Sequence, residues 1–304
     1  MLPYHFGIKP EEFNVLIFEQ KETGGTLFEL ARRLYFMWSG TDVAIRRKLP
    51  MFAPNSAGDR KSLTNLTMQS AAQTFPFLSK FVSTYCSPRL IILTAEEFCS
   101  RFHGQELAAK LEKVFNSARS DKSSIHNYHL IYGVALAAPA EVRNMLEIGM
   151  GTNNTDVISN MGSSGTPGAS LRAFRDFLPN AHIYGADIDR RILFQEDRIS
   201  TFFVDQTDLA SFDQLGKTNV SFDLIIDDGL HSPDANIAVI IFALKRLTPR
   251  GWLVIEDIHV SARSLWETFS ALLPNSYDSY LIEAKGALVF AVRERFSGAG
   301  TTSA

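Results

Sequence analysis

The clearest hydrophobic pattern in the chain lies between Phe222 and Ile258. Short apolar runs at 224–226 and 252–255 have the length and composition of parallel strands that are buried on both faces. Between them, apolar residues recur at the spacing of a helix with one wide apolar face: Ile237, Val239, Ile240, Ala243, Leu244 and Leu247. Pro249-Arg250-Gly251 then ends this helix. The pattern predicts a strand–helix–strand unit with two neighbouring parallel strands.

The same alternation extends over most of the C-terminal part of the chain. Further strands are predicted at 144–148, 182–187 and 201–204, and helices at 128–138, 169–178 and 262–273. The last two strands, 280–283 and 287–292, are expected to form an antiparallel pair that closes the sheet. Alternating strands and helices require right-handed crossovers and a mainly parallel sheet. We therefore predict an α/β fold, Rossmann-like, with a mostly parallel seven-stranded sheet and helices on both faces.

The N-terminal part has a different pattern. Leu27, Leu30, Ala31 and Leu34 form a helix-like stripe, and residues 70–84 are a second candidate helix that contains Pro76. Residues 88–94 could form a strand, followed by a helix with Thr94 as its N-cap. We expect a mainly helical N-terminal domain over 1–120, a second domain over 121–296 and a flexible tail over 297–304.

Composition narrows the possible functions. The chain has 304 residues with a formal net charge of -3, and this charge argues against a nucleic-acid binder, which needs a basic surface. Cys86 and Cys99 are too few for a disulfide framework. No apolar run reaches membrane-spanning length, and the first residues do not form a signal peptide. We expect a cytoplasmic homo-oligomer with neither a nucleic-acid nor a membrane partner.

Acidic residues follow two of the predicted neighbouring strands. Asp227-Asp228 ends one strand, Glu256-Asp257 ends the other, and His231 follows three residues after Asp228. Ligands of open α/β sheets bind at this carboxyl edge, and carboxylate oxygens suit magnesium. His231 has a side chain whose ordinary pKa suits a general base. The alternative is that these acids cap helices and complete turns, and that His231 is a surface residue.

A glycine turn follows the first predicted strand of the sheet. Glu147-Ile148-Gly149-Met150-Gly151 lacks a third close glycine, so it departs from the dinucleotide fingerprint. The carboxylate of Glu147 would also repel a pyrophosphate. Asp187 ends the next strand, where a ribose-binding carboxylate is expected, and Asp205 follows the third strand.

In their order and spacing these motifs resemble the class I S-adenosylmethionine-dependent methyltransferases. The sequence is most similar to the magnesium-dependent sugar O-methyltransferases of macrolide biosynthesis, and the resemblance covers roughly residues 121 to 292. The motifs that carry it are LEIGMG, GADID, FDLIIDDGLH and GWLVIEDI, the Asp121, Lys122, His126 and Tyr128 of a DKxxxHxY element, and the Gly168, Ser170, Leu171 and Arg172 of a GxSLR helix start. Leu230 departs from this pattern, since a small residue is usual in the turn, and Ala235-Asn236 stand where a second histidine is common.

The resemblance implies a set of site residues. S-adenosylmethionine would be held by Glu147, Gly149, Gly151, Ser170, Asp187, Asp205, Asp227 and Tyr128, with Asp187 on the ribose hydroxyls and Asp205 near the adenine. Mg²⁺ would be held by Asp228, Glu256 and Asp257. His231 would be the catalytic base, beside the catalytic metal ligand Asp228.

The expected function is therefore metal-assisted O-methylation of a hydroxyl on a sugar or a glycosylated small molecule, with S-adenosylmethionine and Mg²⁺ as cofactors. The expected binding partner of the protein is therefore this small-molecule or sugar acceptor substrate. Three alternatives stay open from the sequence, and one of them is a non-catalytic relative that only binds or scaffolds, against which the intact group of acids argues. The acceptor could be a non-sugar hydroxyl or an amine, or the sheet could serve a nicotinamide-dependent oxidoreductase, against which the missing glycine and Glu147 argue.

Overall fold

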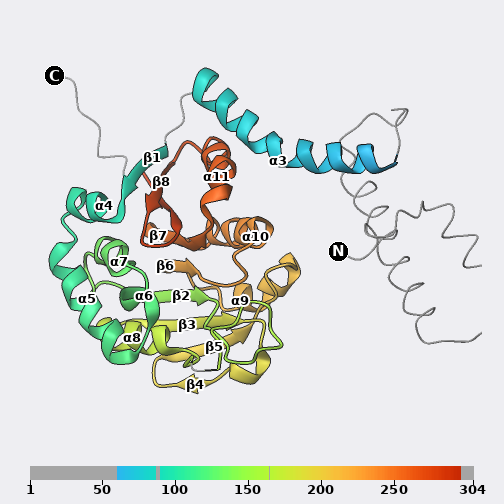
Figure 1. Ribbon diagram of the computed structural model, residues 1–304. Helices are drawn as coiled ribbons and strands as arrows, with labels where there is room; N and C mark the ends of the chain where they lie inside the picture. Colours follow the sequence, from blue (N-terminus) through green and yellow to red (C-terminus); the bar gives the residue numbers. More distant parts are fainter. Residues whose placement is uncertain (1–59, 87–89, 164, 296–304) are drawn as a thin grey trace, which may run out of the picture. The chain divides into compact units, whose positions relative to one another are not determined.

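The computed structural model describes residues 60–86, 90–163 and 165–295, and Figure 1 draws their helices and strands. The helical stripe predicted near residue 30 and the tail predicted over 297–304 lie outside the described residues. The chain divides into two compact units between Phe77 and Leu78. This division lies inside helix α3 (Arg60–Tyr85) and well before the boundary predicted at residue 120.

The second unit is built on one sheet with the order β1-β8-β9-β7-β6-β2-β3-β5-β4. The pairs β1/β8, β7/β6, β6/β2, β2/β3 and β3/β5 are parallel, whereas β8/β9, β9/β7 and β5/β4 are antiparallel. The strands are β1 (Leu90–Thr94), β2 (Asn144–Ile148), β3 (His182–Asp187), β4 (Gln195–Glu196), β5 (Ile199–Phe203), β6 (Phe222–Asp227), β7 (Leu247–Ile258), β8 (Tyr277–Glu283) and β9 (Leu288–Glu294). The predicted mostly parallel α/β sheet is confirmed.

The predicted number of strands was wrong, because within the described residues the sheet has nine strands and not seven. The two additional strands lie at its two edges. β1 was recognised as a candidate strand but assigned to the helical N-terminal region, and it pairs in parallel with β8, far away in the sequence. β4 has only two residues, Gln195 and Glu196, which is too short for a period-two pattern to be visible.

Helices cover both faces of the sheet (Figure 1). One layer consists of α4 (Ala95–Arg101), α5 (Gln105–Ala118), α6 (Asp121–Ser124), α7 (His129–Ala135) and α8 (Ala169–Phe177). The other consists of α9 (Asp213–Lys217), α10 (Pro233–Ala243) and α11 (Arg263–Ser270), and short 3-10 turns lie at 190–192, 209–212 and 260–262. Consecutive residues of a strand pack on opposite faces of the sheet. Met145 belongs to the hydrophobic core between the sheet and the first helical layer, and Leu146 belongs to the core between the sheet and the second layer. This division explains why the central strands carry apolar residues on both faces.

Local signals fix several element ends. Thr94 forms the predicted N-cap of α4, in a capping box with Glu97. α10 ends at Ala243, before the predicted end at Leu247, because Leu247 already pairs with Phe222 as the first residue of β7. The described residues contain no helix that is both long and apolar enough to cross a membrane.

Candidate functional site

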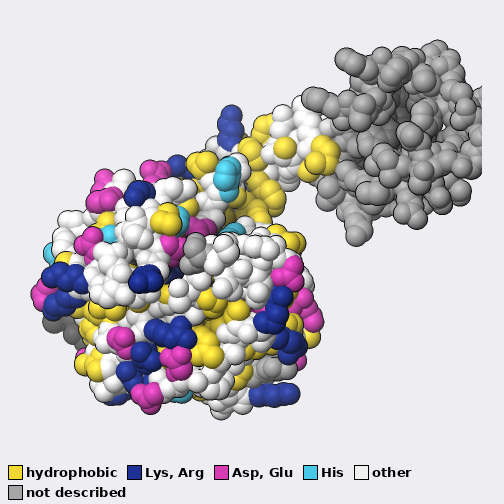
Figure 2. All heavy atoms as spheres, turned by 60° about the horizontal axis from the view of Figure 1, so that its bottom comes forward, with side chains coloured by type: hydrophobic (Ala, Val, Ile, Leu, Met, Phe, Trp, Pro, Cys, Tyr) yellow, Lys and Arg dark blue, Asp and Glu magenta, His cyan; other side chains and the backbone are white. Residues whose placement is uncertain are grey.

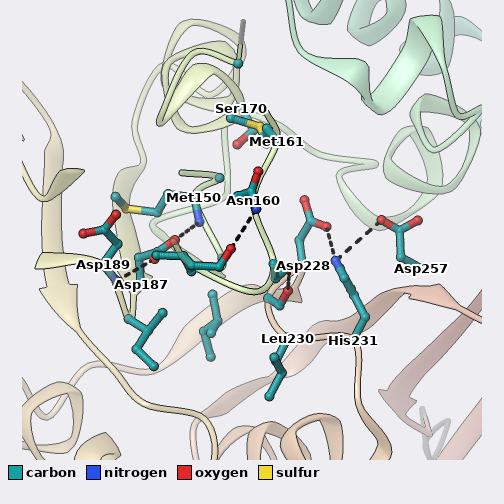
Figure 3. Close-up of a pocket in the computed structure, with 18 of the residues that line it drawn as sticks. Met150, Asn160, Met161, Ser170, Asp187, Asp189, Asp228, Leu230, His231 and Asp257 are labelled. Atoms are coloured by element: carbon teal, nitrogen blue, oxygen red, sulfur yellow. Dashed lines mark hydrogen bonds and ion pairs between the residues drawn. The ribbon is translucent and has the colours of Figure 1, made fainter. Parts of the chain in front are cut away.

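The carboxyl ends of the parallel strands surround a cavity of about 870 Å³. It is lined by the residues that follow β2, β3, β5, β6 and β7 and by the loop between β2 and α8, and Figure 3 shows part of this lining. On the face shown in Figure 2, acidic and basic side chains are interspersed among apolar ones. The cavity contains most of the predicted site residues.

One half of the cavity is formed around the glycine turn. The carboxylate of Asp187 accepts hydrogen bonds from the backbone N–H groups of Met150, at 2.9 Å, and Asp189, at 2.8 Å. These bonds join the ends of β2 and β3, and burial raises the pKa of Asp187. Each Asp187 oxygen has a second lone pair that can still accept a hydrogen bond from a ligand in the cavity.

Asp189, two residues further on, has a structural role. Its oxygens accept hydrogen bonds from Thr152, Asn154 and Arg191, and Arg191 in turn pairs with Asp156. The Arg191 guanidinium lowers the pKa of Asp189. At the other end of the same loop, Ser159 donates a 2.6 Å hydrogen bond to the backbone oxygen of Gly229. The loop between β2 and α8 is thus fastened on both sides of the cavity.

The other half of the cavity is acidic. Its centre is Asp228, His231 and Asp257, each of which offers one ligand atom, all within 4.8 Å of one another. Nε2 of His231 lies 3.9 Å from Oδ1 of Asp228 and 3.9 Å from Oδ2 of Asp257, so the ring faces both carboxylates (Figure 3). The sequence predicted this group from two strand ends.

A bulge in β7 explains how two consecutive acids reach the same side of the sheet. In a regular strand Glu256 and Asp257 would point to opposite faces. The pairing of β7 with β9 shifts between Ile255 and Ile258, and Asp257 has a φ of 54°, in the left-handed region. Such a bulge re-aims side chains. Both carboxylates therefore meet the same neighbouring segment, which contains α6 and α7.

That segment, residues 121–135, covers the acids from the side of the first helical layer. The phenol of Tyr128 donates to Asp257, and the phenol of Tyr132 donates to Glu256. Nζ of Lys122 lies 2.5 Å from Oε2 of Glu256 and 2.7 Å from Oδ2 of Asp228. The same Nζ atom lies 3.1 Å from Oε1 of Glu147, on β2. The DKxxxHxY element thus packs over the acidic centre and donates hydrogen bonds to its carboxylates.

Burial and charge compete at this centre. Burial alone would lower the pKa of Lys122, but the carboxylates of Asp228, Glu256 and Glu147 outweigh it and raise this pKa well above its ordinary value. Burial raises the pKa of Glu256, although Lys122 opposes the shift. Burial likewise raises the pKa of Glu147, which also accepts a 2.6 Å hydrogen bond from Ser170. The ammonium therefore stays charged and neutralises part of the acidic group.

The predicted site residues fall into two sets. Those that line the cavity are Gly149, Gly151, Ser170, Asp187, Asp205, Asp228, His231 and Asp257. Those buried behind its wall are Glu147, Asp227, Glu256 and Tyr128. Asp227 points to the other face of the sheet, where its oxygens accept hydrogen bonds from Gln206 and Asn236. The roles assigned to both sets stay predictions.

Sequence reasoning did not assign a role to Lys122 or Tyr132. Lys122 belongs to the recognised DKxxxHxY element, so its place in the motif was visible while its partners were not. A lysine that is almost fully buried is rare unless it is paired, but burial cannot be read from the sequence. Tyr132 had no signal beyond its position on the apolar face of a short helix.

Comparison with protein-family models finds no match. Among curated proteins, the chain is 30% identical over 150 residues to the 8-demethyl-8-alpha-L-rhamnosyl tetracenomycin-C 2'-O-methyltransferase of Streptomyces olivaceus. The aligned region covers 49% of this chain and 37% of that protein. The chain is also 38% identical over 92 residues to the mycinamicin VI 2''-O-methyltransferase of Micromonospora griseorubida. This aligned region covers 30% of this chain and 23% of that protein. The matches thus span little more than a third, or less, of these relatives' length.

A similar structure is that of the MycE methyltransferase in complex with Mg, SAH and mycinamycin VI. It has a TM-score of 0.48 and 21% sequence identity, and the match covers 63% of this chain and 56% of that chain. Human methyltransferase-like protein 13 in complex with SAH has a TM-score of 0.39 and 19% identity, covering 57% of this chain and 83% of that chain. The sequence similarity to sugar O-methyltransferases that the motifs indicate is therefore confirmed by the curated relatives.

Proposed function

We propose that this protein is an S-adenosylmethionine-dependent, metal-assisted O-methyltransferase that acts on a hydroxyl of a sugar or of a glycosylated small molecule. The observation that carries the proposal is the convergence of Asp228, His231 and Asp257 at one end of the cavity, beside the glycine turn and Asp187 at the other. The curated relatives are named as O-methyltransferases of glycosylated natural products, which supports the same activity.

The half of the cavity around Asp187 is the proposed cofactor site. Asp187 would accept hydrogen bonds from the ribose hydroxyls of S-adenosylmethionine through its remaining lone pairs. Asp205 also lines the cavity, on the side where the adenine would lie. Gly149 and Gly151 have φ values of 88° and 73°, so the turn between them brings the backbone close to the ligand.

The acidic half fits a hard divalent cation such as Mg²⁺, because its donor atoms are carboxylate oxygens on adjacent strands. Asp228 and Asp257 would hold the cation on the cavity side. Glu256, the third predicted ligand, could join them only with an oxygen that now accepts a hydrogen bond from Lys122 or Tyr132. A cation held there would supply Lewis-acid chemistry, which makes a nearby hydroxyl more acidic.

The residues of this chain would then align and deprotonate the acceptor. The methyl group of S-adenosylmethionine is already activated, so the main requirement is an in-line approach of the hydroxyl oxygen. His231 would take the hydroxyl proton at Nε2, the atom that faces Asp228 and Asp257. Transfer of the methyl group breaks its bond to sulfur, forms the bond to oxygen and leaves S-adenosylhomocysteine.

The test is methyl transfer by the purified protein, with S-adenosylmethionine, Mg²⁺ and a panel of rhamnosylated and other glycosylated acceptors. We expect a mass gain of one methyl group on a glycoside, no product with excess chelator, and recovery on addition of Mg²⁺. Methylation of a catechol or an amine without any glycoside product would favour the alternative acceptors. In calorimetry, binding of NAD without binding of S-adenosylhomocysteine would support an oxidoreductase and contradict the proposal.

A further inference from the structure

Lys122 brings a positive charge into the acidic site from α6, and its side chain is only 2% exposed. Its ammonium contacts carboxylates from three neighbouring strands: Glu147 on β2, Asp228 after β6 and Glu256 on β7. An ammonium has three N–H donors, so these three acids match its full donor capacity. Buried carboxylates so close together are costly without a cation.

The three contacts are unequal. Nζ of Lys122 lies 2.5 Å from Glu256 and 2.7 Å from Asp228, but 3.1 Å from Oε1 of Glu147. That oxygen of Glu147 makes no hydrogen bond of good geometry, although it is fully buried. The ammonium therefore lies closer to Asp228 and Glu256, which are two of the three acids that were predicted to bind the metal. Oε1 of Glu147 remains available to accept a hydrogen bond from this ammonium.

A divalent cation at Asp228 and Asp257 would lie close to this ammonium, because Asp228 contacts both groups. Oδ2 of Asp228 accepts from Lys122, while its Oδ1 faces His231 and the cavity. Like charges at such a separation repel strongly where the surroundings are mostly buried. Cation and ammonium therefore compete for Asp228 and Glu256, and Glu147 is the acceptor toward which the ammonium can retreat.

We propose that Lys122 is a positioning residue that serves as a built-in counterion of the acidic site. Its ammonium neutralises Asp228 and Glu256 when no divalent cation is bound, and it is displaced toward Glu147 when one binds. The inference rests on the proposed function, since it requires a divalent cation at Asp228 and Asp257. Lys122 thereby keeps the cation affinity of the site low and keeps the site folded without metal.

The experiment measures Mn²⁺ binding by electron paramagnetic resonance to the full chain and to the variants Lys122→Met and Lys122→Arg. Lys122→Met has nearly the same length but no charge, so we expect Mn²⁺ to bind at least about tenfold more tightly. Lys122→Arg keeps the charge and should bind Mn²⁺ more weakly than Lys122→Met. The melting temperature of Lys122→Met should fall in chelator and recover with Mg²⁺, while that of the wild type changes little.

Glu147→Gln provides a second test that leaves Lys122 in place, in case Lys122→Met does not fold. Because the ammonium then has no negatively charged acceptor to move toward, we expect Glu147→Gln to weaken Mn²⁺ binding by about threefold or more. The same change in the Lys122→Met background should have no such effect. The counterion role is overturned if Lys122→Met binds Mn²⁺ no more tightly than the wild type, or if Glu147→Gln leaves the affinity unchanged. If neither the wild type nor Lys122→Met binds Mn²⁺, the metal site of the proposed function fails as well.

Discussion

His231 and Asp257 both have left-handed backbone conformations, with φ values of 55° and 54°, and Nε2 of His231 lies 3.9 Å from Oδ2 of Asp257. Residues other than glycine rarely adopt this conformation, and when they do they concentrate at functional sites. The two residues come from the ends of neighbouring strands, β6 and β7. Backbone geometry at two separate strand ends therefore brings the imidazole to the acids.

The first prediction concerns His231 as the base. His231→Asn should lower turnover by about 10²–10⁴-fold, the usual size of general-base catalysis. Asn is chosen because it tolerates a left-handed backbone better than Ala. The deficit should shrink as the pH rises, since hydroxide can replace the base. The measurement is the single-turnover rate at several pH values.

His126 is the matched control for His231. Its Nε2 also lies 3.9 Å from Asp257, but its Nδ1 lies 3.1 Å from the backbone oxygen of Lys285 and its ring stacks on Tyr128. His126→Asn should therefore change the rate by less than about tenfold. If His126→Asn loses the rate while His231→Asn keeps it, the base has been assigned to the wrong histidine.

The second prediction concerns Asp187 as the ribose-binding residue. Asp187→Ala should weaken S-adenosylhomocysteine binding by about tenfold or more, because charge-assisted hydrogen bonds to the ribose are lost. Asp189→Asn is the comparison variant, since the oxygens of Asp189 already accept hydrogen bonds from Thr152, Asn154 and Arg191. Calorimetry of both variants separates the two carboxylates. A stronger effect at Asp189 than at Asp187 would move the ribose contact to Asp189.

The third prediction concerns the glycine turn. A Cβ atom at Gly149 would lie 2.0 Å from the backbone oxygen of Asp228, whereas one at Gly162 would meet nothing within 4 Å. Both glycines have positive φ, 88° and 72°, so both Ala variants incur the strain of a left-handed backbone. Gly162→Ala should cost about 1 kcal/mol of unfolding free energy. Gly149→Ala should cost about 3 kcal/mol or more, because the Asp228 backbone must also shift.

Urea denaturation of both glycine variants tests this difference. Equal losses of unfolding free energy would mean that the turn can move away from Asp228. Because Asp228 is also a proposed metal ligand, Gly149→Ala should in addition weaken Mn²⁺ binding, and Gly162→Ala should not.

The fourth prediction concerns pH and Asp227. Burial raises the pKa of Asp227 from 3.8 to about 6, although Asn236 and Gln206 donate hydrogen bonds to it. The native carboxyl then keeps its proton at pH values where the unfolded chain has lost it. Its contribution to stability is fully present below about pH 4 and is lost as the pH rises through the folded-state pKa. The loss amounts to roughly 3 kcal/mol.

Asp227→Asn cannot ionise, so it provides the reference for this pH effect. The unfolding free energy of the wild type should fall relative to that of Asp227→Asn by roughly 3 kcal/mol between about pH 4 and about pH 7. Urea denaturation in the presence of chelator measures both proteins. A constant difference across this range would mean that the pKa of Asp227 is the same in the native and unfolded states.

Much of the fold could be predicted because it follows from local patterns. The strands predicted at 144–148 and around the apolar run 224–226 are buried parallel strands, since a strand covered on both faces needs apolar residues on both of them. Thr94 caps its helix as predicted because a capping box involves residues only three apart. The convergence of Asp228 and Asp257 also followed from sequence, because the ends of neighbouring parallel strands meet at one edge.

The tertiary structure decided what depends on contacts between distant residues. The edge strand β1 joined the sheet through pairing with β8, which no local pattern encodes. The bulge at Asp257 depends on the register with β9, and it turns two consecutive carboxylates toward one segment. Lys122 meets Asp228 and Glu256 across 106 and 134 residues of sequence. The acids that end the strands can be recognised from local patterns, whereas the packing of α6 and α7 against the sheet sets which cation and which phenols those acids contact, because burial and charge pairing arise only when the chain is folded.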